Sequence, residues 1–239
     1  MSWAHGAFLG FDTETTGVDV EHDRIVTAAL VHRDAAGTRV STWLIDPGIE
    51  IPAAATAIHG ISTEHARAHG SPPARALDEI ATALADELGK GTPVVAFNAS
   101  YDLCLLDAEL RRYGLVTLPE RLGREVSPVI DPLVLDRAEA RYRPGKRKLA
   151  DLCAVYRVAD TGSLHTADVD VVATLDVLAQ IVTRYPHLGE LSLDALHDYQ
   201  VAAHRTWAEG FNAWRHERGL TGPDAGLSWP AREATGSAR

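Results

Sequence analysis

A short apolar run that ends directly in two carboxylates constrains the fold of this chain more than any other feature. The run covers residues 7–11, and Asp12 and Glu14 follow it. Such a run is typical of a buried strand. Because side chains alternate along a strand, Asp12 and Glu14 point to one face and Thr13 to the other. Neighbouring carboxylates resist ionising together unless a cation lies between them, and hard oxygen ligands suit Mg²⁺ or Mn²⁺. The sequence therefore predicts a metal site at the end of a buried strand.

The order of the remaining patterns predicts an α/β fold. Three runs rich in β-branched and aromatic residues come first, and strand–helix alternations follow. A hairpin at residues 34–37 makes the second strand antiparallel to its neighbours. The strands are expected at residues 7–14, 25–32, 39–45, 93–97 and 128–131. The helices are expected at residues 73–88, 100–113 (with Ser100 as N-cap), 133–142, 148–156, 167–185 and 191–218. Together they form a five-stranded mixed sheet flanked by helices, with Asp12 near its middle.

Length and composition favour one domain with an appendage. A chain of 239 residues can bury one good core. We expect a main domain at residues 7–184, a C-terminal helical extension at 186–218 and a loose tail at 219–239, where Gly, Pro, Ser and Ala are frequent. Trp207, Phe211 and Trp214 of the extension are expected to form a stripe packed on the body. No run of eighteen apolar residues and no signal-peptide core are present, so we expect a cytoplasmic protein without membrane contact.

The formal net charge of −10 argues against broad adhesion to nucleic acid. It still permits an enzyme that grips only a few nucleotides, because bound cations would offset its catalytic acids. One basic run stands out within residues 141–148, in a Pro-Gly loop between two helical patterns. Such a run is usually a solvated face, but this position would also let it reach a phosphate.

Further acids and a histidine are expected to converge on the end of the first strand. Asp102 lies in the first turn of the helix after the fourth strand, and in an open α/β sheet a site forms beyond the strand ends. His165 and Asp170 are five residues apart, which on one helix would turn them roughly 140° from each other. We therefore place His165 in the loop before the helix that carries Asp170. A histidine there can take a proton from water near neutral pH.

With these residues the chain resembles the DEDDh 3′→5′ exonucleases, the DnaQ-like family that includes the proofreading epsilon subunit of bacterial DNA polymerase III. The first family motif matches at residues 12–17, the second at 98–102, and the third, His-x-Ala-x-x-Asp, at 165–170. Two secondary segments, at residues 58–62 and 148–153, are also similar. The resemblance covers about residues 7–184. This range contains every candidate residue named so far except the aromatic stripe of the C-terminal extension.

The resemblance implies a ribonuclease H-like fold and two bound Mg²⁺ or Mn²⁺ ions. Nucleoside 5′-monophosphates would be released from single-stranded or frayed 3′ ends. His165 would be the general base. The positions that match the family's metal ligands are Asp12, Glu14, Asp102 and Asp170. The positions that match its contacts to the terminal nucleotide are Thr15, His59 and Ile61. Phe97 and Thr166 depart from the His and Arg common in relatives, and Asp168 matches no family position.

Substrate and partner are less defined than the chemistry. No motif separates DNA from RNA, because that choice depends on contacts to the 2′-hydroxyl. We take DNA as the favoured substrate and a polymerase or repair complex as the partner. A haloacid-dehalogenase-like phosphatase is one alternative, but it requires Asp where this chain has Glu14. The other alternative is a catalytically inactive DnaQ-like module that binds a polymerase or repair complex, and the intact acids argue against it.

Overall fold

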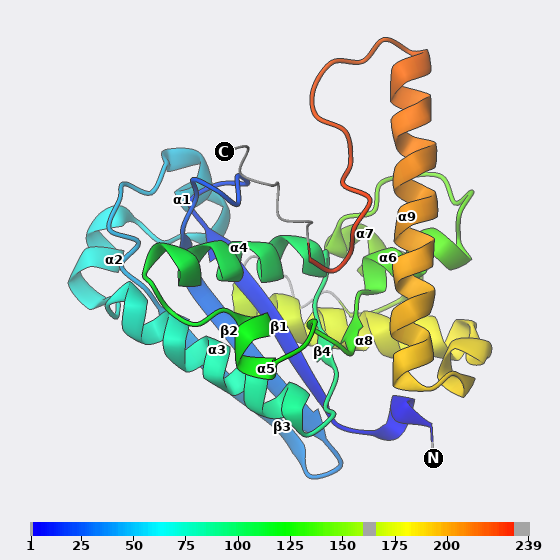
Figure 1. The fold of residues 1–239 in the computed structure, drawn as a ribbon, viewed down its shortest axis with the longest axis horizontal. Coiled ribbons are helices and arrows are strands. Elements are labelled where there is room, and N and C mark those ends of the chain that lie inside the picture. Colours follow the sequence, from blue (N-terminus) through cyan, green and yellow to red (C-terminus); the bar gives the residue numbers. More distant parts are fainter. Residues whose placement is uncertain (1, 160–165, 232–239) are drawn as a thin grey trace.

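The computed structural model describes residues 2–159 and 166–231 of the chain. Its centre is a mixed sheet with strand order β3-β2-β1-β4-β5 (Figure 1). The strands are β1 (Phe8–Thr15), β2 (Ile25–Asp34), β3 (Gly37–Leu44), β4 (Val94–Val95) and β5 (Val129–Ile130). β2 is antiparallel to β1 and β3, whereas β4 is parallel to β1 and to β5. The predicted five-stranded mixed sheet is confirmed, with Asp12 on its central strand.

Helices cover both faces of this sheet. They are α1 (Ala53–His59), α2 (Thr63–His69), α3 (Pro73–Gly89), α4 (Ala99–Arg112), α5 (Leu118–Leu122), α6 (Pro132–Glu139), α7 (Leu149–Tyr156), α8 (Ala167–Arg184) and α9 (Leu193–Glu217). Leu9 and Phe11 of β1 pack in one core with α3, α4 and α5. On the opposite face, Ala29 and Val31 of β2 pack with α7 and α8. The alternation of side chains along the strands thus separates two cores.

α9 closes the sheet at the free edge of β5. The buried Gln200 side chain donates from Nε2 to the Val129 carbonyl (3.0 Å) and accepts from the Asp131 N–H through Oε1 (2.7 Å). His197 Nδ1 accepts from the Val129 N–H at 3.1 Å. An edge strand has backbone donors and acceptors without a strand partner. Side chains of α9 therefore make the hydrogen bonds that another strand would make.

The start of α4 differs from the sequence expectation. Ser100 is not the N-cap, because the helix begins at Ala99 and is preceded by Asn98 in the left-handed region, with φ 61° and no side-chain cap. The carboxylate of Asp131 instead accepts from the N–H groups of Asn98 (3.1 Å) and Ala99 (2.9 Å). An acid at the end of β5 thus satisfies the free amides at the N-terminus of α4.

The aromatic stripe of α9 packs on the body only at one end. Trp207 is half-buried beneath Arg137 of α6, whereas Phe211 and Trp214 are exposed. The buried residues of α9 are Leu196, Gln200 and Ala208. In Figure 1 the C-terminal half of α9 extends beyond the sheet, and the following segment returns alongside it. That segment reaches the core again at Trp229, which is buried. Within the described parts of the chain, no helix combines the length and apolar character needed to cross a bilayer.

Candidate active site

Three carboxylates from two elements meet at the end of β1. Asp12 and Glu14 come from β1, and Asp170 comes from the first turn of α8. One carboxylate oxygen of each lies within 4.8 Å of the others. Oxygens on opposite sides of one ion would be about 4–5 Å apart at ordinary Mg²⁺ or Ca²⁺ distances. The three side chains are therefore close enough to share a cation.

Gly10 allows α8 to approach β1 closely. A Cβ atom at Gly10 would lie 2.2 Å from Cγ1 of Val171 and 3.4 Å from Cδ1 of Leu175. No side chain fits this space, so the residue after Asp170 packs directly against the strand backbone. This role of Gly10 was not predicted from the sequence. A glycine inside a strand pattern is a known mark of close backbone approach, and that was the available signal.

Asp102 reaches β1 from α4 and is held by Thr13. Its Oδ1 accepts from the Thr13 N–H (3.1 Å) and from the Thr13 hydroxyl (2.6 Å), and the residue is only 3% exposed. Thr13 lies between Asp12 and Glu14 in the strand, so these two bonds bring Asp102 near enough to repel both carboxylates. Asp102 is not one of the three acids whose oxygens lie within 4.8 Å of one another. The sequence predicted only that Thr13 faces away from its acidic neighbours.

Burial and repulsion make these carboxylates hard to ionise. The pKa of Asp12 lies well above its usual range, first because of burial and then because of the neighbouring carboxylates. The same two causes raise the pKa of Glu14 to about 7. Burial raises the pKa of Asp102 to about 7, although the bonds from Thr13 act in the opposite direction. The cluster therefore gains from added positive charge, and its oxygen donors are those that Mg²⁺ and Mn²⁺ prefer.

A cavity of about 300 Å³ adjoins Glu14 and contains two of the predicted nucleotide contacts, His59 and Ile61. Nδ1 of His59 accepts from the Ile61 N–H at 3.1 Å. Burial is the main cause that lowers the pKa of His59, so its imidazole is neutral near pH 7. Trp43 and Asp168 also line the cavity. The structure thus brings together an acid, an imidazole and an indole ring around one small space.

The third predicted nucleotide contact, Thr15, does not line this cavity. The Thr15 hydroxyl donates to the Gly17 carbonyl at 2.6 Å, and the Tyr101 hydroxyl donates to the same carbonyl at 2.5 Å. Thr15 therefore holds the turn that follows β1. His165 lies outside the described residues, and the structure says nothing of its position.

The family model described as Exonuclease (RNase_T) matches residues 9–178, a segment that contains all four clustered acids. The chain belongs to this exonuclease family. It is 31% identical over 188 residues to an uncharacterized exonuclease of Escherichia phage 186, a match that covers 74% of this chain and 88% of the phage protein. The DnaQ-like resemblance is therefore confirmed.

Other exonuclease relatives are much longer proteins. The chain is 30% identical over 170 residues to the PolC-type DNA polymerase III of Streptococcus thermophilus, which is 70% of this chain but 10% of the polymerase. It thus spans about a tenth of such relatives. A crystal structure of E. coli exonuclease I in complex with a dA16 oligonucleotide aligns with a TM-score of 0.66 at 21% identity, over 84% of this chain and 44% of that chain. The fold is therefore the predicted ribonuclease H-like exonuclease fold.

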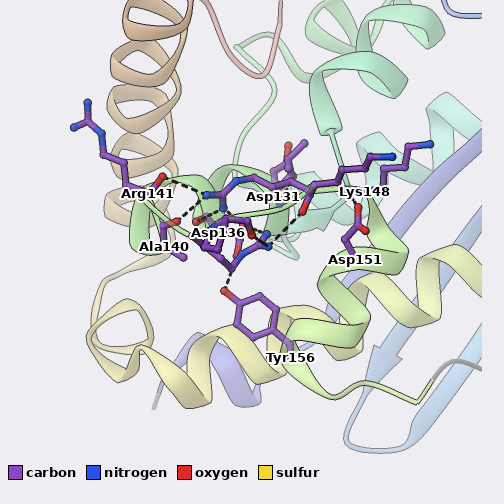
Figure 2. Close-up of polar contacts among 12 residues, drawn as sticks. Asp131, Asp136, Ala140, Arg141, Lys148, Asp151 and Tyr156 are labelled. Carbon is purple, nitrogen blue, oxygen red and sulfur yellow. Dashed lines mark hydrogen bonds and ion pairs between the residues drawn. The ribbon is translucent and has the colours of Figure 1, made fainter.

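Two arginines of the basic run bind a buried acid outside the β1 cluster. Asp136 of α6 is fully buried and accepts hydrogen bonds from Arg143, Arg147 and Tyr156, which we call the Asp136 cluster (Figure 2). Arg147 also donates to the Ala140 carbonyl at 2.7 Å. Two arginines of the run therefore fix their loop to α6 and do not extend towards a phosphate.

Proposed function

We propose that this exonuclease works in the 3′→5′ direction, on single-stranded or frayed DNA ends, and releases nucleoside 5′-monophosphates. The observation that carries the proposal is the meeting of Asp12, Glu14 and Asp170 within 4.8 Å at the end of β1. Hydrolysis of a phosphodiester places new negative charge on the phosphate and on the leaving oxygen. A cluster of acids can assist that reaction only with cations bound. The oxygen donors and raised pKa values fit divalent ions.

We assign two Mg²⁺ or Mn²⁺ ions to Asp12, Glu14, Asp102 and Asp170. When bound, such ions would polarise the attacking water and balance the charge that develops on the phosphate. The remaining task of the chain is to hold the four acids in place. Thr13 fixes the orientation of Asp102 through two hydrogen bonds, and Gly10 lets the start of α8 come close to the strand.

Other residues would bind the terminal nucleotide and accept the proton of the attacking water. We assign the terminal nucleotide to the cavity beside Glu14, where His59 and Ile61 would contact it. A volume of about 300 Å³ is at the small end of ligand pockets, which suits a single nucleotide. Thr15 would contribute indirectly, because its hydroxyl holds the turn that follows β1. His165 would accept the proton of the attacking water. A DNA polymerase or repair complex is the proposed partner, because polymerase III relatives carry the same segment within longer chains.

The test is cleavage of end-labelled DNA and RNA strands in Mg²⁺, in Mn²⁺ and in EDTA. We expect single-nucleotide products from DNA 3′ ends, and only with a divalent ion. Asp12→Asn should lower the rate by at least about 10³-fold, and His165→Ala by about 10²–10⁴-fold, the usual contribution of a positioned base. Asp176→Asn is a matched control, because this acid of α8 pairs with Arg33 away from the cluster.

Three outcomes would contradict the proposal. Cleavage of a closed circular single strand would show an endonuclease. Faster cleavage of RNA than DNA would overturn the substrate. Tight binding without cleavage in either ion would indicate an inactive binding module.

A further inference from the structure

An aromatic ladder lies along α9, formed by Trp207, Phe211 and Trp214. Consecutive ring centroids are 5.4 Å and 5.9 Å apart, with interplanar angles of 16° and 22°. The Arg137 guanidinium lies 3.6 Å from the Trp207 ring centroid, and that of Arg218 lies 4.7 Å from the Trp214 centroid. Phe211 is 36% exposed and Trp214 42%. An ordered, exposed group of large apolar side chains marks a binding surface.

A groove of about 600 Å³ lies between this ladder and the loop that follows α6. Arg141 and Tyr142 line its other side, and Tyr142 is 90% exposed. In Figure 2 the Arg141 side chain points away from the Asp136 cluster. Among the described residues that line the groove, the charged ones are Arg137, Arg141 and Arg147. A chain with a net charge of −10 thus carries a locally positive groove with exposed aromatic walls.

This combination matches the chemistry of one class of ligand. Single-stranded nucleic acids bind where a basic groove follows the phosphates and aromatic rings stack on the bases. The aromatic rings alone would suit an apolar protein segment as well. Arg147 is already paired with Asp136. An apolar segment would leave Arg141 without an added counter-charge, whereas the phosphates of a polyanion would supply one.

The position of the groove agrees with a strand that continues from the active site. The acids lie on β1, and only β4 and β5 separate that strand from the edge that α9 covers. Two strand spacings amount to about 10 Å between β1 and β5, and the groove lies beyond β5 along α9. A nucleic-acid strand of several nucleotides can therefore extend from the end of β1 past α9.

We propose that the groove between the aromatic ladder and the Arg141–Tyr142 side binds single-stranded nucleic acid upstream of the 3′ end that enters the active site. One base stacks on the exposed ring of Tyr142, and another takes the place of the Arg218 guanidinium on the outer face of Trp214. Arg141 contacts a phosphate. The direction of the strand rests on the proposed function, but binding at the groove requires no cleavage.

The test is binding of a fluorescent oligothymidylate of about 20 nucleotides in EDTA, which exceeds the 4–16 nucleotides of a typical single-strand site. Tyr142→Ala and Trp214→Ala should each weaken binding by roughly 5- to 150-fold, the range for loss of one stacked base. Arg141→Ala should reduce the slope of log K against log salt by about 0.7, the value for one phosphate on a single strand. Arg75→Ala, an exposed arginine on α3, is the matched control and should change neither quantity. Thermal melting of each variant checks that it is folded.

Cleavage separates this inference from the proposed function. With Mg²⁺, Trp214→Ala should reduce kcat/KM more for the long strand than for a dinucleotide. Equal affinity of wild type and all three groove variants would overturn the inference even if the protein is an active exonuclease. A protein that binds through the groove but cleaves nothing would support the inference and overturn the proposed function. If the variants instead dissociate a dimer without changing DNA affinity, the ladder is a protein contact and the inference is wrong.

Discussion

The Asp136 cluster and the acid cluster on β1 bury carboxylates in opposite ways. Asp136 is fully buried, but two arginines and the Tyr156 hydroxyl surround it. Asp12 and Glu14 are instead affected mainly by burial and by other carboxylates, and their pKa values rise. Side chains of the protein balance the charge of Asp136. The charge of the β1 acids is left to be balanced by cations from solution. Burial of an acid therefore does not by itself indicate a functional site. A buried acid whose charge no side chain of the protein balances is the better indicator.

The largest stability effect is expected at Asp136. Asp136→Asn should lower the free energy of unfolding by about 3 kcal/mol, because removing one partner of a buried ion pair leaves the others uncompensated. Arg143 and Arg147, which fix the loop after α6, would lose their shared acceptor. Urea denaturation measures this change. Asp176→Asn, which breaks a partly exposed ion pair with Arg33, should cost less than about 1 kcal/mol. Equal losses in the two variants would show that the arginines do not balance the Asp136 charge more strongly than Arg33 balances that of Asp176.

A smaller effect is expected at Gly10. Gly10→Ala places a methyl group against Val171, and overpacking of this kind costs about 1–3 kcal/mol. The start of α8 must move, and Asp170 with it, so activity should fall further than stability alone explains. Nuclease rates measured well below the melting temperature test this. Gly89→Ala is the control, because a Cβ atom there meets nothing within 4 Å. A stable Gly10→Ala protein with full activity would show that α8 need not approach so closely.

The smallest effect concerns pH in the metal-free protein. The folded-state pKa of Glu14 is raised from 4.5 to about 7, so the folded state binds the proton more tightly than the unfolded state. This contribution to stability is fully present below about 4.5 and is lost as pH rises through about 7. We expect a change on the order of 1–2 kcal/mol after allowance for solvent screening. Melting temperatures in EDTA across this range measure it.

The effect of pH on stability must be compared with that in a variant, because buried histidines also change the stability in the same pH range. Burial is the main cause of the lowered pKa values of His59 and His197, so their protonation opposes the trend of Glu14. Asp12→Asn leaves these histidines in place and removes one repelling charge. The difference between wild type and Asp12→Asn isolates the carboxylates. If this difference is independent of pH, the repulsion inferred for β1 is too weak to matter.

Much of the fold was predictable because it depends on local patterns. Alternation in β1 predicts the shared face of Asp12 and Glu14, and the hairpin predicts the antiparallel β2. α1, α2 and α5 were missed, since helices of seven, seven and five residues show too little periodicity. Only the Trp207 end of the stripe on α9 packs on the body, because a helical spacing does not reveal how much of a helix face is covered.

The site was predictable from motifs only at the level of its acids. Which atoms hold those acids depends on contacts between distant segments. Thr13 binds Asp102, 89 positions away, and the role of Gly10 appears only once α8 is known to lie on β1. The division at residue 184 and the assignment of His165 stay predictions.

The hydrogen bonds of α9 with β5 have a consequence for how the protein behaves in a crowded solution. A bare edge strand is a template on which another copy can add a strand, and repetition of that step leads to aggregates. Gln200 and His197 occupy the backbone groups of Val129 that such a copy would use. A helix cannot be extended by strand pairing, so growth of the sheet stops there. α9 thus prevents strand addition at the β5 edge of the sheet.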